Sequence, residues 1–221
     1  MLAHFRNTFA TSCLLTTLTL TALPLTGLTL TALTLTGCGG GSTTASELRL
    51  SAVTGAATFA PTITTSVFKS TDENTADIFL TDLPLDRLAN TRDDLSDLAG
   101  NFIHIRLFLV PAAGKTPIDP TACNVAVNHF VFAQGATGVY SGGGFMSVSD
   151  TPTGTLFGGT LENVSVRLTR ATPNFADRLG ASTLTGTIEA PRNEETAKAL
   201  EARTIRLLST LRTTAAPGKL P

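Results

Sequence analysis

Three side chains near the middle of this 221-residue chain are of types that can do chemistry: His104, Cys123 and His129. A thiol beside an imidazole can form a nucleophilic pair, and two imidazoles with a carboxylate can hold a metal ion. Cys123 and His129 lie in phase in one alternating apolar stretch, but the extended chain between them spans roughly 20 Å. Within a single strand they therefore cannot form a thiol–imidazole pair.

The two histidines would come together only if the strands that carry them pair on a shared face. His104 lies on the face opposite Ile103 and Ile105, beside Phe102. Neither histidine belongs to an H-x-H or H-x-x-x-H spacing, which would favour a metal site. We therefore expect satisfied or surface histidines, no bound metal and no cofactor.

Two short stretches resemble parts of catalytic motifs but lack residues that those motifs need. Ala113–Thr116 (AGKT) would end a P-loop, but Leu109 stands where its first glycine should be and Pro117 interrupts the helix that should follow. Ser141–Gly144 (SGGG) lacks the glycine that a nucleophile elbow requires at position 139. Three glycines in a strand pattern instead predict a bulge or a close backbone approach, which a ligand could use.

An acidic segment, residues 72–97, contains eight carboxylates and only two arginines, Arg87 and Arg92. Carboxylate oxygens suit calcium, but the segment contains no D-x-D-x-D-G loop. A solvated acidic face is therefore the favoured interpretation. The carboxylates are those of Asp72, Glu73, Asp77, Asp82, Asp86, Asp93, Asp94 and Asp97.

The N-terminal 37 residues have the layout of a secretory signal peptide. Arg6 precedes a stretch without charge from Thr8 to Gly37, and ten leucines lie between Leu14 and Leu35. The alternation of Leu and Thr would also suit a strand, but its position behind a positive N-terminus favours a signal peptide. The segment is longer than the usual length of about 15–30 residues because it contains a ten-residue sequence repeat.

The end of this segment, Leu35-Thr36-Gly37-Cys38, resembles the lipobox of bacterial lipoproteins. The resemblance implies cleavage before Cys38, a lipid on its thiol and a membrane partner reached through that lipid. Gly39 stands where an inner-membrane retention signal would have Asp, so in a diderm host the outer membrane is favoured. The alternative is an uncleaved transmembrane anchor, because about 20 apolar residues can span a bilayer.

The rest of the chain divides into a flexible tether, residues 38–47, and one mostly β domain, residues 48–221. We expect an antiparallel sandwich or barrel-like roll, since the strands do not show the regular spacing of βαβ units. A short helix is expected near 85–98 and a C-terminal helix near 193–212, capped by Asn193 and docked through Leu200, Leu208 and Leu211. The expected strands are 57–68, 75–81, 101–110, 123–133, 138–149, 160–170 and 182–190.

Cys123 is the single free thiol that these predictions leave. Cys13 departs with the signal peptide and Cys38 carries lipid, so the domain has no internal disulfide. Free cysteine is among the most buried residue types, and we expect Cys123 to be a buried small hydrophobe.

The composition excludes more functions than it indicates. The net charge of −1 gives no electrostatic basis for nucleic-acid binding, and a single Tyr without Trp gives little for a sugar platform. The favoured function is a non-catalytic domain that binds a ligand or an envelope partner, or supports the envelope. The alternatives are a carrier of apolar ligands such as lipid, with an internal cavity, and a hydrolase without a recognisable motif.

Overall fold

The computed structural model of the chain describes residues 46–111 and 122–214. Within these residues, ten strands form one sheet and two segments are helical. The predicted signal peptide, Cys38, nearly all of the predicted tether and Ala113–Thr116 lie outside the described residues. The strands are β1 (Glu47–Ala52), β2 (Thr58–Phe59), β3 (Thr65–Lys69), β4 (Ala76–Thr81), β5 (Ala99–Leu107), β6 (Val125–Ala133), β7 (Thr137–Val148), β8 (Leu156–Ala171), β9 (Ser182–Pro191) and β10 (Arg212–Thr213).

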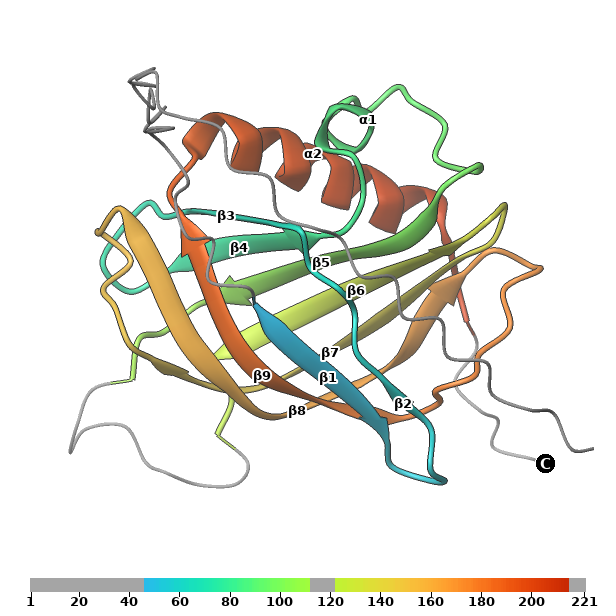
Figure 1. The fold of residues 1–221 in the computed structure, drawn as a ribbon, viewed down its shortest axis with the longest axis horizontal. Coiled ribbons are helices and arrows are strands. Elements are labelled where there is room, and N and C mark those ends of the chain that lie inside the picture. Colours follow the sequence, from blue (N-terminus) through green and yellow to red (C-terminus); the bar gives the residue numbers. More distant parts are fainter. Residues whose placement is uncertain (1–45, 112–121, 215–221) are drawn as a thin grey trace, which may run out of the picture. The chain divides into compact units, whose positions relative to one another are not determined.

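The sheet is antiparallel throughout its strand pairs and curls into a roll (Figure 1). Its strand order is β2-β1-β9-β8-β7-β6-β5-β4-β3, and β10 adds to β8. The curl brings β3 back to the end of β9, where the backbone N–H of Asn193 donates to the carbonyl of Phe68 at 3.0 Å. The barrel-like roll is therefore confirmed in preference to two separate sheets.

Alternation along the strands gives the sheet an inner and an outer apolar face. On β5, Ile103, Ile105 and Leu107 are buried inside the roll, while Phe102 and His104 belong to the outer face. The inner cluster continues with residues of every strand from β3 to β9, such as Phe157 on β8. Because both faces bury apolar side chains, the outer face needs a cover of its own.

Helix α2 (Glu194–Thr210) provides that cover and crosses the outside of the sheet (Figure 1). The Asn193 side chain accepts a hydrogen bond from the backbone N–H of Thr196 at 3.1 Å, which confirms the predicted cap. Ala197 and Leu200 are buried against the outer cluster, with Leu208 and Leu211 partly buried beside them. The predicted helix and its docked position are both confirmed.

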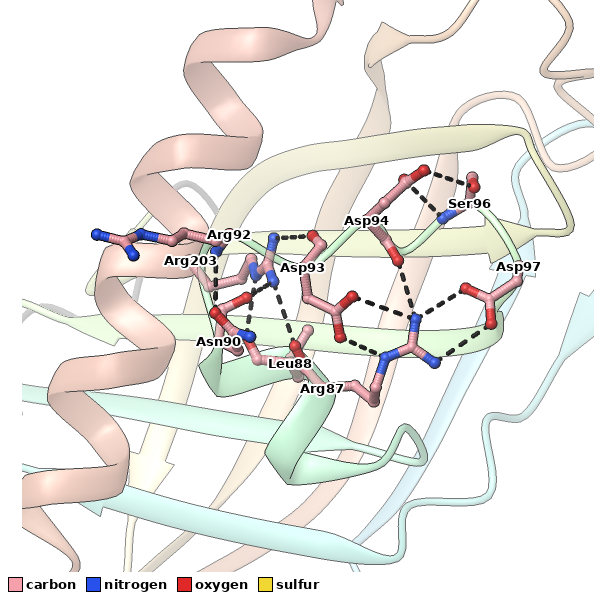
Figure 2. A network of polar contacts seen from close by, with 9 residues as sticks. All are labelled: Arg87, Leu88, Asn90, Arg92, Asp93, Asp94, Ser96, Asp97 and Arg203. Atoms are coloured by element: carbon pink, nitrogen blue, oxygen red, sulfur yellow. Dashed lines mark hydrogen bonds and ion pairs between the residues drawn. The ribbon is translucent and has the colours of Figure 1, made fainter.

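Helix α1 (Leu85–Ala89) is much shorter than the helix expected over 85–98. Beyond Ala89 the chain turns around the Arg203 guanidinium, which reaches it from α2 (Figure 2). The Nε of Arg203 donates to the carbonyl of Leu88 at 2.9 Å and its Nη1 to that of Asp93 at 3.2 Å. These bonds satisfy the carbonyls of a turning segment that cannot continue as a helix.

Two other predicted boundaries change. The stretch 57–68 is not one strand, because Pro61 lies in a break between β2 and β3. Strand β1 was not predicted at all, although it pairs with β9 along its whole length. Of the described helices, neither is long and apolar enough to span a membrane.

Candidate functional site

An apolar hollow of about 480 Å³ lies at the end of the roll where β6 ends and β7 begins. Short strand β2 and the loop between β8 and β9 complete its wall. Most of the lining is apolar or aromatic, with polar groups supplied mainly by the loop. The lining residues are Ala57, Thr58, Phe59, Val131, Ala133, Ala136, Tyr140, Asn174, Phe175, Ala176, Arg178 and Leu179.

The loop that forms one wall is fixed in place by a glycine and an aromatic pair. A side chain at Gly138 would collide with the ring of Phe175. Glycine at this position therefore allows the ring to pack directly against β7. Phe175 in turn meets the ring of Tyr140 edge-on, with centroids 6.3 Å apart. The amide of Asn174 holds the loop to the β6–β7 turn through a 3.0 Å bond to the carbonyl of Gly135.

Tyr140 forms the floor of the hollow, and its hydroxyl contacts the same loop. The hydroxyl donates to Asp177 Oδ1 at 2.7 Å. Burial, reinforced by this bond and by the charge of Asp177, raises the pKa of Tyr140 above its usual value. Asp177 also accepts from the backbone N–H of Gly180 at 2.9 Å, so one carboxylate organises the loop. Tyr140 therefore stays protonated and serves as a fixed polar group in a largely apolar wall.

His129 lies directly behind this floor, between the rings of Phe59 and Tyr140. It is completely buried, and its Nε2 lies 3.0 Å from Oδ1 of Asn101. The Asn101 side-chain amide donates to Asp82 Oδ2 at 2.7 Å. Burial lowers the pKa of His129 to about 4, so the ring is uncharged at neutral pH.

His104 occupies the opposite face of the sheet and does not meet His129. Strands β5 and β6 do pair, but His104 stands opposite Asn128 while His129 stands opposite Ile103. His104 stacks on a phenylalanine ring and its Nε2 lies 2.8 Å from Oδ1 of Asp77. Burial alone would raise the pKa of Asp77, but the hydrogen bond and charge of His104 bring it below its usual value.

The positions of these side chains show which of the combinations considered from the sequence come together. Within residues 46–111 and 122–214, no group of three or more His, Cys, Asp and Glu side chains could hold a metal ion. The outer face does carry a hydroxyl near the Asp77–His104 pair, that of Ser141. Its Oγ donates to Oδ1 of Asn128 at 2.8 Å, and Asn128 stands between Ser141 and His104 in the register. An acid, an imidazole and a hydroxyl thus share the face without direct contact.

No protein family, no curated protein and no solved structure matches this chain.

The glycines of the SGGG stretch serve close strand packing. A side chain at Gly142 would collide with the carbonyl of Ser165, and one at Gly144 with the backbone of Val164. The register between β7 and β8 shifts next to them, at Gly143 and Phe145. The predicted bulge and close backbone approach are confirmed, and the approaching group is the neighbouring strand.

The acidic segment is organised by arginines (Figure 2). Arg87 forms an ion pair with Asp93 and another with Asp97, the second at 2.9 Å. Hydrogen bonds from Arg87 to Asp97 lower the pKa of that carboxyl. The backbone carbonyl of Asp94 accepts a hydrogen bond from Arg87 at 2.9 Å, and its carboxylate accepts one from the Ser96 hydroxyl. The side of the segment that surrounds Arg87 is thus a structural ion-pair network.

Cys123 is exposed, so the prediction that it is buried was wrong. Strand β6 begins only at Val125, and Cys123 lies before it, where alternation no longer fixes the direction of a side chain. Its Sγ lies 3.3 Å from the carbonyl of Val125.

We expect the Cys123 thiol to react with a maleimide in the folded protein at a rate close to that of the unfolded chain, because accessibility governs modification. The rate is measured with the full-length protein, and Cys123→Ser gives the background from the other cysteines. A large slowing on folding would mean that the thiol is covered.

The residues around the hollow were not predicted as a site. Phe59, Val131, Tyr140 and Phe175 come from four separate parts of the chain and meet only when the sheet curls. The alternating pattern did correctly indicate that Val131 lies on the same face of its strand as His129. The sequence contains no signal that β2 and the loop after β8 close over that face.

Proposed function

We propose that this protein is a lipid-anchored protein of the cell envelope whose β domain is a non-catalytic binding module. The lipobox at Cys38 supports the anchor, and Gly39 favours the outer membrane in a diderm host. The domain would face the extracytoplasmic side, joined to the membrane by the tether of residues 38–47. We propose no nucleic-acid partner, in keeping with the net charge of −1.

The observation that carries the binding function is the apolar hollow at the end of the roll. Its volume of about 480 Å³ falls in the range of about 300–1,000 Å³ that small-molecule sites occupy. Aromatic and aliphatic side chains line it, and the Tyr140 hydroxyl with its Asp177 partner adds a polar edge. A few fixed polar groups in an apolar wall are typical of a site that binds and orients a small molecule.

A second candidate is a carrier of apolar ligands such as lipid, and the same lining favours it. The middle of the roll is filled by buried side chains of the inner cluster, including Phe68, Phe157 and Leu161. A carrier would therefore hold its ligand at the end of the roll and enclose only part of a long acyl chain. A hydrolase is supported less, since Asn128 separates the Ser141 hydroxyl from the Asp77–His104 pair.

If the hollow is the binding site, a bulky side chain that fills it should weaken the binding of an apolar molecule. Ala133 lines it and is exposed, so Ala133→Trp should place an indole there without disturbing the core. We expect this change to raise the dissociation constant of an apolar probe, 2-methoxynaphthalene, at least about tenfold, because the probe loses its apolar contacts. The constant is measured on the full-length protein in nonionic detergent, with the free probe determined by equilibrium dialysis.

The matched control is Ala126→Trp, an exposed alanine of the same strand on its outer face. This variant should bind the probe as the unchanged protein does. Equal binding by the Ala133→Trp variant would show that the probe does not use the hollow and would remove the basis of the proposal.

A further inference from the structure

We infer that the molecule bound in the hollow carries a hydroxyl or N–H group that donates a hydrogen bond to Nδ1 of His129. This inference rests on the proposed binding function and adds the chemical class of the ligand. The class is a largely apolar molecule with a hydrogen-bond donor.

The neighbours of the His129 ring determine which of its nitrogens carries the proton. A carboxylate only accepts hydrogen bonds, so the group of Asn101 that contacts Asp82 is the amide NH₂. The other end of that amide, Oδ1, is an acceptor and faces Nε2 of His129 at 3.0 Å. Nε2 must therefore carry the proton, and Nδ1 of the neutral ring presents a lone pair.

This lone pair has no partner among the described residues. Nδ1 of His129 is buried and no donor of residues 46–111 or 122–214 reaches it. Most buried polar atoms in proteins are hydrogen-bonded, and an exception requires a reason. His104 also has an unpartnered Nδ1, but that ring stands on the outer face, away from the hollow.

His129 adjoins the hollow. Ala133 and Val131 line it from the inner face of β6, and His129 is the next residue inward on that face. Its ring lies between two rings that also line the hollow, with centroid distances of 6.2 Å to Phe59 and 6.3 Å to Tyr140.

Of these two rings, that of Phe59 can be displaced more easily. It belongs to β2, a two-residue strand at the edge of the sheet, and it is half-buried. Tyr140 is fully buried in the middle of the sheet and bonded to Asp177. Short edge segments open at low free-energy cost, so a shift of Phe59 would extend the hollow toward the His129 ring.

The test compares two probes that share a naphthalene ring and differ in the donor. 2-Naphthol has a hydroxyl proton, whereas 2-methoxynaphthalene has an oxygen that cannot donate. We expect 2-naphthol to bind about three- to tenfold more tightly at neutral pH, the worth of one hydrogen bond. Binding is measured on the full-length protein in nonionic detergent at known free probe concentrations.

A spectroscopic readout locates the bond. In protein labelled with ¹⁵N-histidine, 2-naphthol should move the Nδ1 signal of His129 in the direction of an accepted hydrogen bond, and 2-methoxynaphthalene should not. The His104 signal, from the outer face, should stay in place with both probes. The His129→Leu variant should bind the two probes equally, and Phe59→Ala, which leaves His129 intact, should keep the preference for 2-naphthol.

The outcomes separate the inference from the function on which it rests. If both probes bind equally to the unchanged protein and the Nδ1 signal stays in place, the inference is overturned while the binding function stands. A preference for 2-naphthol that persists in His129→Leu also overturns it. If neither probe binds, the proposed function and the inference both fail.

Discussion

Replacing Arg203 with methionine should lower the free energy of unfolding by about 2–4 kcal/mol. The side chain is 2 % exposed, and its guanidinium donates to backbone carbonyls of Arg87, Leu88, Asn90 and Asp93 (Figure 2). Methionine keeps an apolar stem but removes the donor from the carbonyls of Arg87, Leu88 and Asp93, while that of Asn90 still accepts from the backbone N–H of Asp93 at 2.9 Å. The loss should appear as a lower melting temperature in circular dichroism of the full-length protein.

The matched control is Arg206→Met on the same helix. Arg206 is exposed, so its replacement should change the free energy of unfolding by no more than about 0.5 kcal/mol. If the two variants melt at the same temperature, the guanidinium of Arg203 does not hold the 87–93 segment against α2.

Truncating Leu200 to alanine should cost about 2–5 kcal/mol of stability, the usual range for a buried leucine. Leu200 is 1 % exposed where α2 packs on the outer face of the sheet, and the Lys69–Glu201 ion pair at 2.7 Å holds the helix there. Leu208→Ala should cost less, because Leu208 is only partly buried. Both values come from urea unfolding of the full-length protein.

Ile205 provides the internal control for α2, since it is 63 % exposed on the same helix. Ile205→Ala should leave the unfolding curve nearly unchanged. A Leu200→Ala variant that is as stable as Ile205→Ala would show that α2 is not docked on the sheet through Leu200.

The elements that the sequence predicted best are those that local patterns determine. The alternation of β5 and the helical stripe and Asn193 cap of α2 are properties of neighbouring residues, and both elements lie where expected. The end of α1 was not predictable in this way. It depends on Arg203, which lies 115 residues further along the chain from Leu88.

The candidate site was predictable only in part, for the same reason. Alternation correctly placed His104 and His129 on their strands, but the register between β5 and β6 decides that they face opposite sides. The hollow beside His129 requires Phe59 and Phe175 to meet across the curled sheet. Cys123 was misplaced because the alternation was extended beyond the start of β6.

The proposed lipid anchor is tested most directly by the intact mass of the protein isolated from bacterial membranes. We expect a chain that begins at Cys38 and carries acyl groups, and a Cys38→Ser variant that keeps its leader and gains no lipid. A wild-type chain that still begins at Met1, or a Cys38→Ser variant that is processed and partitions into detergent like the wild type, would contradict it.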